Sequence, residues 1–362
     1  MASNSEPTTP AYNLAALGWS DELAAMFAAV AHLDDVAGRV ARVDTGVVTA
    51  LTSSGPVRAS WGASVLAAAA ADASAAPSTG DWVTLRHWPD QRATVEAVLT
   101  RRTILRRAVA SGRSEIQILA TNVDVVLVVI SLAVEPDLGR VERLVALAWE
   151  SGAQPVLVLT KADLVGDAEL VAQDVAQVAP GTPVHVVSVP TGVGMSALSP
   201  YLSRGTTVAL IGPSGVGKST LANALVGADI LRIGATRADG KGRHVTVTRD
   251  LVMLPTGGVL IDTPGLRGVG LLDGGLETAF PEIVALSTQC RFADCTHVRE
   301  PGCAVLAAVD AGDVPARRLE SWRKLQAEAQ QMAVRSNARL RAEQSRHRAL
   351  SKSVRRAEVP RA

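Results

Sequence analysis

The stretch TTVALIGPSGVGKSTLANALVG, residues 206–227, decides the fold of this 362-residue chain. An apolar run of strand length leads into a glycine-rich loop, and a segment of helical composition leaves the loop and stops at Gly227. Glycines let backbone amides curl around phosphate oxygens, and the start of a helix adds partial positive charge. The pattern predicts a phosphate-binding loop in an α/β domain. The residues expected at the phosphates are Gly212, Pro213, Ser214, Gly215, Val216, Gly217, Lys218, Ser219 and Thr220.

Two of these side chains carry specific predictions. Lys218 is expected to reach the β- and γ-phosphates, which makes it a catalytic candidate, and the Ser219 hydroxyl is expected to bind Mg²⁺. Downstream, the run GGVLID ends at Asp262 and continues as D-T-P-G to Gly265. A carboxylate beside the loop predicts part of the Mg²⁺ shell, and the Gly265 amide is expected to donate to the γ-phosphate.

The basic, glycine-rich stretch 237–248 between these motifs is typical of a switch loop. Thr246 is the predicted second hydroxyl ligand of Mg²⁺, with Thr248 as the alternative. Leu266 follows the D-T-P-G motif at a position where related switches carry a water-orienting Gln. His244 is therefore the predicted group that positions the attacking water.

A third motif, T-K-A-D, follows the apolar run PVLVL and ends at Asp163. Its carboxylate can accept hydrogen bonds from N1–H and the 2-amino group of guanine, whereas adenine would leave it unpaired. The Lys161 stem can pack over the base plane, and Thr160 stands where Asn is usual. Ser188, after the run VHVV, is predicted to form a second wall of the base pocket.

The order of these motifs along the chain is unusual, because the base-reading motif precedes the phosphate loop. In most guanine-nucleotide switches it comes last. A permuted chain can form the same sheet, since domain termini usually lie close together. Apolar runs that alternate with helical stretches, such as 138–149 and 167–178, predict a largely parallel sheet covered on both faces. We expect a circularly permuted α/β domain over residues 109–270.

Residues 36–108 show short alternating runs broken by Gly, Pro, Asp and Ser. This pattern predicts a small β-barrel, interpreted as an OB-fold with an SH3-like barrel as the alternative. Residues 1–35 are expected to form an N-terminal extension that includes a short helix. The chain is thus predicted to be multidomain.

All three cysteines fall in one segment with the spacing C-x4-C-x-H-x5-C. Four soft or borderline ligands can close a tetrahedral zinc site with no open position, so the predicted Zn²⁺ is structural. We place this site in a mainly helical domain, 271–345, followed by a basic tail, 346–362. Residues 313–362 carry 13 Lys and Arg against five Asp and Glu, which beside a barrel favours contact with an RNA backbone. The predicted zinc ligands are Cys290, Cys295, His297 and Cys303.

The bulk composition favours a soluble protein. A net charge of +1 with 48% hydrophobic and 20% charged residues is ordinary for a globular chain. The apolar runs are shorter than the roughly 20 residues of a membrane helix, and the N-terminus has no apolar signal core. We expect a cytoplasmic monomer without membrane contact.

Together, GDWV at 80–83, T-K-A-D, the phosphate loop, GRHVT at 242–246, D-T-P-G and the cysteine segment resemble the ribosome small-subunit-dependent GTPase A family. The resemblance implies a GTP hydrolase that forms GDP and phosphate with Mg²⁺ and carries one structural Zn²⁺. It also implies an OB-fold, a permuted GTPase domain and a zinc domain that dock on the small ribosomal subunit and its rRNA. Hydrolysis stimulated by the subunit, during late subunit maturation, is implied as well. A catalytic His in the switch region is a further implication, and His244 matches it.

Two other interpretations stay open at this point. In one, the protein is an RNA-binding assembly factor whose nucleotide is mainly structural. In the other, it is a P-loop kinase or transporter-type ATPase that uses ATP. Asp163 and the permuted motif order disfavour the ATP-dependent class.

Overall fold

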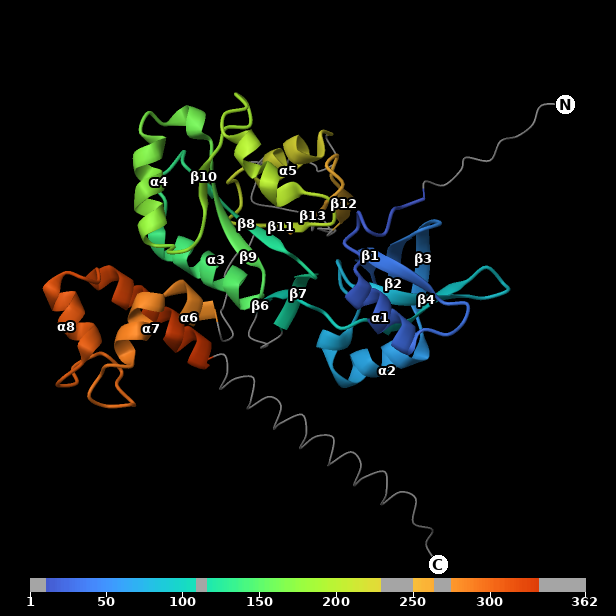
Figure 1. Ribbon diagram of the computed structural model, residues 1–362, viewed down its shortest axis with the longest axis horizontal. Coiled ribbons are helices and arrows are strands. Elements are labelled where there is room, and N and C mark those ends of the chain that lie inside the picture. The colour runs from blue at the N-terminus through green and yellow to red at the C-terminus, as the bar shows by residue number, and fades with distance from the viewer. Residues whose placement is uncertain (1–10, 109–115, 229–249, 264–274, 332–362) are drawn as a thin grey trace, which may run out of the picture. The chain divides into compact units, whose positions relative to one another are not determined.

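The computed structural model describes residues 11–108, 116–228, 250–263 and 275–331 (Figure 1). The chain divides into two compact units. The first comprises residues 1–106 and 118–267, and the second comprises residues 107–117 and 268–362.

The N-terminal part of the first unit is a closed five-stranded barrel with the strand order β1-β2-β3-β5-β4. Its elements are α1 (Asp21–Val30), β1 (Val36–Asp44), β2 (Val47–Thr52), β3 (Gly55–Trp61), α2 (Ala63–Ala71), η1 (Ala73–Ala75), β4 (Trp82–His87) and β5 (Ala93–Val98). Helix α2, which the sequence pattern does not predict, connects β3 to β4 and buries Val65 among inward-facing residues such as Val40 and Leu85. The closed barrel confirms the predicted OB-type fold.

The second part of this unit is a six-stranded sheet with the order β10-β9-β8-β11-β13-β12. Its strands are β8 (Val125–Ser131), β9 (Gln154–Thr160), β10 (Val184–Val186), β11 (Thr207–Ile211), β12 (Leu251–Met253) and β13 (Val259–Asp262). All neighbours pair in parallel except β12, which runs antiparallel to β13 at the edge. The strand that precedes the phosphate loop, β11, therefore lies between β8, which precedes it in the chain, and β13, which follows it. This order confirms the circularly permuted α/β domain.

Helices and short helical turns connect these strands. They are α3 (Leu138–Glu150), η2 (Ala162–Leu164), α4 (Ala168–Gln177), η3 (Met195–Leu202) and α5 (Lys218–Val226). Asp137 begins α3 by accepting from the Arg140 amide, 3.1 Å away, and Gly227 ends α5 in the left-handed conformation. The carboxyl ends of β8, β9 and β11 consequently lie at one edge, where the connecting loops carry the predicted motifs.

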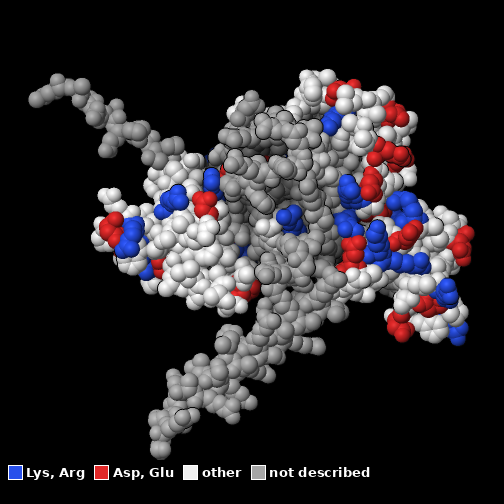
Figure 2. Space-filling view, turned by 180° about the vertical axis from the view of Figure 1, so that it is seen from behind, with Lys and Arg blue, Asp and Glu red and all other residues white. Residues whose placement is uncertain are grey.

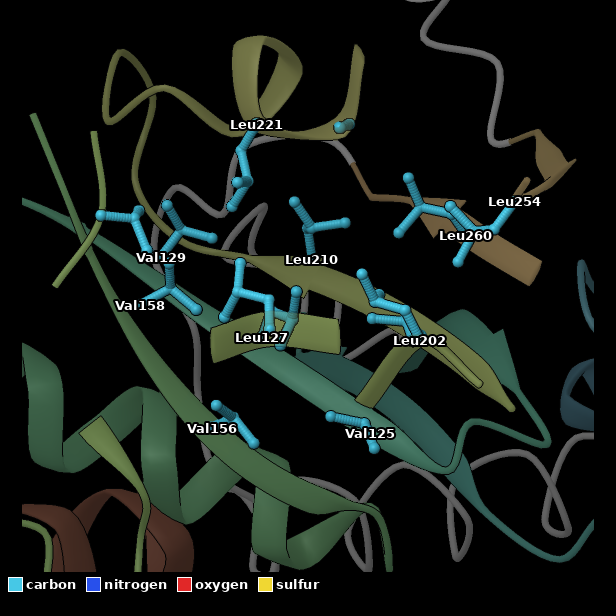
Figure 3. Packing of buried hydrophobic residues seen from close by; sticks show 14 of the residues in the cluster. Val125, Leu127, Val129, Val156, Val158, Leu202, Leu210, Leu221, Leu254 and Leu260 are labelled. Carbon is cyan, nitrogen blue, oxygen red and sulfur yellow. The ribbon is translucent and has the colours of Figure 1, made fainter. Parts of the chain in front are cut away.

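An apolar core holds α5 and η3 against this sheet. Alternate residues of the central strands, such as Leu127, Val158 and Leu210, point to the same face and are fully buried. Figure 3 shows Leu221 of α5 facing this layer. Burial of each such side chain contributes about 1.5–3 kcal/mol, so the core fixes the helix that follows the phosphate loop.

A two-stranded sheet, β6 (Ile104–Ala108) with β7 (Ile116–Thr121), links the barrel to β8 in the chain. The sequence pattern does not predict this pair of strands. Here the barrel and the α/β domain approach closely: a Cβ on Gly80 would lie 2.2 Å from the Thr121 carbonyl oxygen. Glycine, with φ near +98°, is therefore required at this contact.

Residues 275–331 of the second unit are mainly helical and include α6 (Gly275–Ala279), α7 (Pro281–Ser287), α8 (Ala304–Ala311) and a helical run over 316–331. Arg318 joins these helices, because its guanidinium donates to the Ala279 carbonyl at 2.7 Å and lies 4.4 Å over the Phe280 ring. No helix among the described residues is both long and apolar enough to cross a membrane.

Candidate functional site

The phosphate loop bends sharply between β11 and α5. Gly212 has φ near +151°, and a Cβ there would lie 2.3 Å from the Val129 carbonyl oxygen of β8. Gly217, with φ near +98°, is the N-cap residue of α5. A side chain at Gly212 would push the loop away from β8, so the sequence places glycine where the backbone must come closest.

Lys218 lies inside this loop. Only 8% of it is exposed, and its Nζ donates to the carbonyl oxygens of Gly212 at 2.9 Å and Pro213 at 2.7 Å. Burial lowers the pKa of Lys218, and the charge of Asp262 opposes that effect. Burial likewise raises the pKa of Asp262, opposed by Lys218. The loop carbonyls therefore hold Lys218 Nζ in place, and its charge interacts with that of Asp262.

The first two residues of the D-T-P-G motif, Asp262 and Thr263, are attached directly to the phosphate-loop strand. β11 and β13 pair in register from Thr207↔Val259 to Leu210↔Asp262, and the Thr263 hydroxyl donates to the Leu210 carbonyl. Asp262 is the last residue of β13, which pairs with β11. Ser219 lies in the first turn of α5, the helix that follows β11 in the chain. These are the described residues that would hold Mg²⁺. The predicted site residues Gly265, His244 and Thr246, with Leu266 and the alternative Thr248, lie outside the described residues.

The base-reading motif contacts the phosphate loop through two side chains. The Thr160 hydroxyl donates to the Val216 carbonyl oxygen at 2.6 Å, and Lys161 Nζ donates to the Gly215 carbonyl oxygen at 3.0 Å. Lys161 adopts the left-handed conformation, with φ of 62°. This backbone conformation is uncommon for residues other than glycine. It occurs where the side chains of Thr160 and Lys161 donate hydrogen bonds to the phosphate loop.

Asp163 is oriented by the predicted second wall. Ser188 Oγ donates to Asp163 Oδ1 at 2.6 Å, and the Ala162 amide donates to the Val187 carbonyl oxygen at 3.2 Å. Ser188 is buried, with 1% exposed. One carboxylate oxygen is therefore fixed by Ser188, and among the described residues no hydrogen bond to the other oxygen is seen.

The structure thus brings the base-reading and phosphate-binding motifs together from opposite sides of the sheet centre. Sequence reasoning missed both the bonds from the T-K-A-D motif to the loop and the bond from Ser188 to Asp163. Spacing alone gives no signal for them, because they depend on the sheet register. The individual roles of these residues in nucleotide binding stay predictions.

The zinc segment forms a compact cluster in the second unit. The candidate ligand atoms of Cys290, Cys295, His297 and Cys303 all lie within 4.8 Å of one another. Cys290 and Cys303 Sγ are 3.8 Å apart, and His297 Nδ1 lies 3.6 Å and 3.3 Å from these two sulfurs. Tetrahedral zinc with bonds of about 2.3 Å to sulfur and 2.0–2.1 Å to nitrogen requires edges of about 3.8 Å and 3.5 Å. The donor set therefore fits one zinc ion.

Several contacts support this cluster. His297 is 3% exposed with φ of 57°, its carbonyl accepts from Arg323, and its ring lies 5.3 Å from that of Trp322. Cys303 begins α8 and its sulfur accepts from the Leu306 amide at 3.4 Å. The protein thus couples a predicted metal ligand to the start of a helix.

Burial raises the pKa of Cys290. Backbone hydrogen bonds from Ala304 and Val305, at the start of α8, lower it by more, so the pKa lies below its usual value.

Comparisons with known proteins agree with this geometry. The family described as RsgA GTPase matches residues 98–272. The chain is 52% identical over 349 residues to the small ribosomal subunit biogenesis GTPase RsgA of Streptomyces avermitilis, covering 95% of this chain and 91% of that relative. The Streptomyces coelicolor protein of the same name is 52% identical over 336 residues, covering 91% of this chain and 90% of that relative.

Solved structures show the same fold. The chain matches the crystal structure of YjeQ from Thermotoga maritima with a TM-score of 0.62 and 26% identity, over 82% of this chain and 98% of that one. It also matches YloQ, described as a circularly permuted GTPase, with a TM-score of 0.57 and 22% identity, over 83% of this chain and 97% of that one. This chain is therefore a GTP hydrolase that belongs to the RsgA family of small ribosomal subunit biogenesis GTPases.

Proposed function

We propose that this GTPase acts in late maturation of the small ribosomal subunit and that the subunit accelerates its hydrolysis of GTP to GDP and phosphate. The observation that carries the proposal is the direct attachment of the base-reading loop to the phosphate loop through Thr160 and Lys161. A partner that moves either loop therefore moves both ends of one nucleotide site. We take the small ribosomal subunit as the partner because the relatives are named small ribosomal subunit biogenesis GTPases.

In this proposal each group at the nucleotide has one task. Asp163, oriented by Ser188, accepts from the guanine edge, and Lys161 packs over the base. Lys218 leaves its loop carbonyls for the β- and γ-phosphates. Ser219, with Asp262 in the surrounding shell and Thr246 from the switch segment, holds Mg²⁺, which offsets the phosphate charge when bound. His244 positions the attacking water, and the Gly265 amide donates to the γ-phosphate.

We expect binding to the small subunit to depend on particular elements of the protein and not on its net charge alone. Figure 2 shows the side of the molecule opposite to that in Figure 1, and on its described surface Lys and Arg side chains are interspersed with Asp and Glu. The net charge of the chain is only +1. The OB-type barrel, the zinc cluster and the basic C-terminal tail are the elements we propose for rRNA contact. The protein acts as a cytoplasmic monomer in this scheme, and one Zn²⁺ ion held by the Cys/His cluster is structural.

The test is a rate measurement on the purified full-length protein, with and without purified small subunits. We expect slow turnover alone and acceleration by about 1,000-fold or more with subunits, the range in which partner-supplied stabilisation acts on other switches. Lys218→Ala should abolish both rates. Absence of acceleration by subunits of verified activity would reject the proposal.

The alternative, an assembly factor whose nucleotide is mainly structural, makes a different prediction in cells. Cells that carry only Lys218→Ala accumulate immature small subunits if turnover matters. Normal maturation in those cells would favour the structural interpretation instead.

A further inference from the structure

Thr160 occupies a buried position where three segments meet. It is the last residue of β9 and is 3% exposed. Its hydroxyl faces two backbone carbonyl oxygens, that of Val216 at 2.6 Å and that of Ile130 at 3.2 Å. Both neighbours are acceptors, so the hydroxyl must supply the proton. Since a Thr hydroxyl has a single proton, its donor capacity is used up within the protein.

The shorter of the two contacts leads to the phosphate loop. Val216 immediately precedes Gly217, the N-cap residue of α5, and a Cβ on Gly217 would lie 3.7 Å from Thr160 Oγ1. Lys161, the next residue, adds its bond to the Gly215 carbonyl oxygen. The loop that carries Asp163 is therefore fastened to the loop that would hold the phosphates.

Guanine presents two kinds of edge to a protein. N1–H and the 2-amino group are donors, whereas N7 and O6 are acceptors. A residue that reads N7 must donate to it. An Asn side chain has two amide protons and could serve a loop carbonyl and N7 together, but Thr160 has only the proton that Val216 already accepts.

We propose that Thr160 is a positioning residue that locks the base-reading loop to the phosphate loop, and that this enzyme recognises guanine without a hydrogen bond from this residue to N7. Discrimination then depends on the N1 and 2-amino edge, which Asp163 accepts. This inference rests on the proposed role of Asp163, and its test separates the two.

The measurement is equilibrium binding of GDP and of 7-deaza-GDP, in which N7 is replaced by C–H, to the full-length protein. We expect the wild-type protein to bind the two nucleotides with affinities equal within about 2-fold. Thr160→Asn supplies a second donor and should prefer GDP over 7-deaza-GDP by about 3- to 10-fold, the value of one neutral hydrogen bond. A merely structural role for residue 160 would not change this ratio.

The positioning role has its own variants. Thr160→Val keeps the shape and removes the hydroxyl, so affinity for both nucleotides should fall by the same factor, about 5- to 20-fold, because the Val216 carbonyl loses its donor. Thr160→Ser should restore binding. Thermal unfolding of each variant shows that the protein is folded.

Three outcomes decide the matter. A wild-type protein that binds 7-deaza-GDP more than about 5-fold more weakly than GDP would overturn the N7 inference. Unchanged GDP affinity in folded Thr160→Val would overturn the positioning role. Inosine diphosphate, which lacks the 2-amino group, checks Asp163 separately. If it binds as well as GDP, the proposed role of Asp163 fails, whatever the 7-deaza result.

Discussion

Arg39 is buried at the junction between the barrel and the α/β domain, and its replacement gives a quantitative test of that junction. It is 1% exposed and donates to the carbonyl oxygens of Leu17, of Gly80 at 3.3 Å and of Asn122 at 3.1 Å. Gly80 keeps a second donor, the Asn122 side-chain amide at 3.0 Å. Among the described residues, the other two carbonyls have only Arg39 as a donor. Arg39→Met would therefore orphan two buried acceptors.

Two opposing effects set the size of the loss. Each orphaned buried acceptor costs about 1–3 kcal/mol, or about 2–6 kcal/mol for both. Against this, burial lowers the pKa of Arg39 from 12.5 to about 10. That shift corresponds to about 3 kcal/mol of unfavourable charge burial, which methionine removes. The net change in stability of Arg39→Met should therefore lie between a gain of about 1 kcal/mol and a loss of about 3 kcal/mol. Arg39→Lys keeps a buried charge and has a single nitrogen for three carbonyls, so it should be less stable than Arg39→Met.

Thermal unfolding of the full-length protein, followed by circular dichroism, provides the assay. A loss of 1 kcal/mol lowers the Tm of a unit of this size by about 2–4 °C. Arg58→Met is the matched control, because Arg58 lies on β3 of the same barrel and is exposed. A lysine variant as stable as the wild-type protein, or a methionine variant destabilised by more than about 4 kcal/mol, would refute the reasoning.

Three further predictions concern the nucleotide, the metal and the pH dependence. Asp163→Asn, with its oxygen still bound by Ser188, turns an amide donor toward the base. Calorimetry should show that the affinity for GDP falls by about 30-fold or more and that the affinity for xanthosine diphosphate rises. Equal weakening of GDP and xanthosine diphosphate binding would contradict the role of Asp163 in reading the base. Removal of zinc with a chelator should lower helical circular dichroism, since Cys303 begins α8, and metal analysis should find about one zinc per chain beforehand. Burial raises the pKa of Asp35, but hydrogen bonds from Arg86 and the His32 amide, with the charge of Arg86, bring it below 3.8. Its stabilisation is therefore present above pH 3.8 and lost as the pH falls below it, so Asp35→Asn should flatten the acid limb of a Tm–pH curve.

The elements that sequence alone could predict are those with a local signal. The phosphate loop, the buried strands and the cysteine cluster each combine residue type with spacing, so they could be located without a fold. Helix α2 is composed largely of alanine, which gives no amphipathic pattern, and it was missed for that reason. The β6–β7 pair of strands lies between two domains, and the sequence between the strands has no two-residue turn signal.

The contacts within the site were harder to predict because they join distant segments. The donation from Thr160 to Val216 spans 56 positions, and that from Ser188 to Asp163 spans 25. Both follow from the order of strands in the sheet, which the motif order indicates only in outline. Arg39 gave no signal at all, since a single arginine in an alternating strand usually reaches solvent.

The strand order of the sheet also bears on how the nascent chain folds on the ribosome. β8, β9 and β10 are synthesised first and can pair with one another, but β8 then forms an open edge until β11 is made. At 5–20 residues per second, translation from Ser131 to Thr207 takes about 4–15 s. Throughout that interval the segment VVLVVIS, fully buried in the finished fold, offers unpaired amides and carbonyls. Such an edge can pair with other chains. Slow elongation through this region therefore exposes the protein to aggregation before β11, the strand that leads into the phosphate loop, has been made.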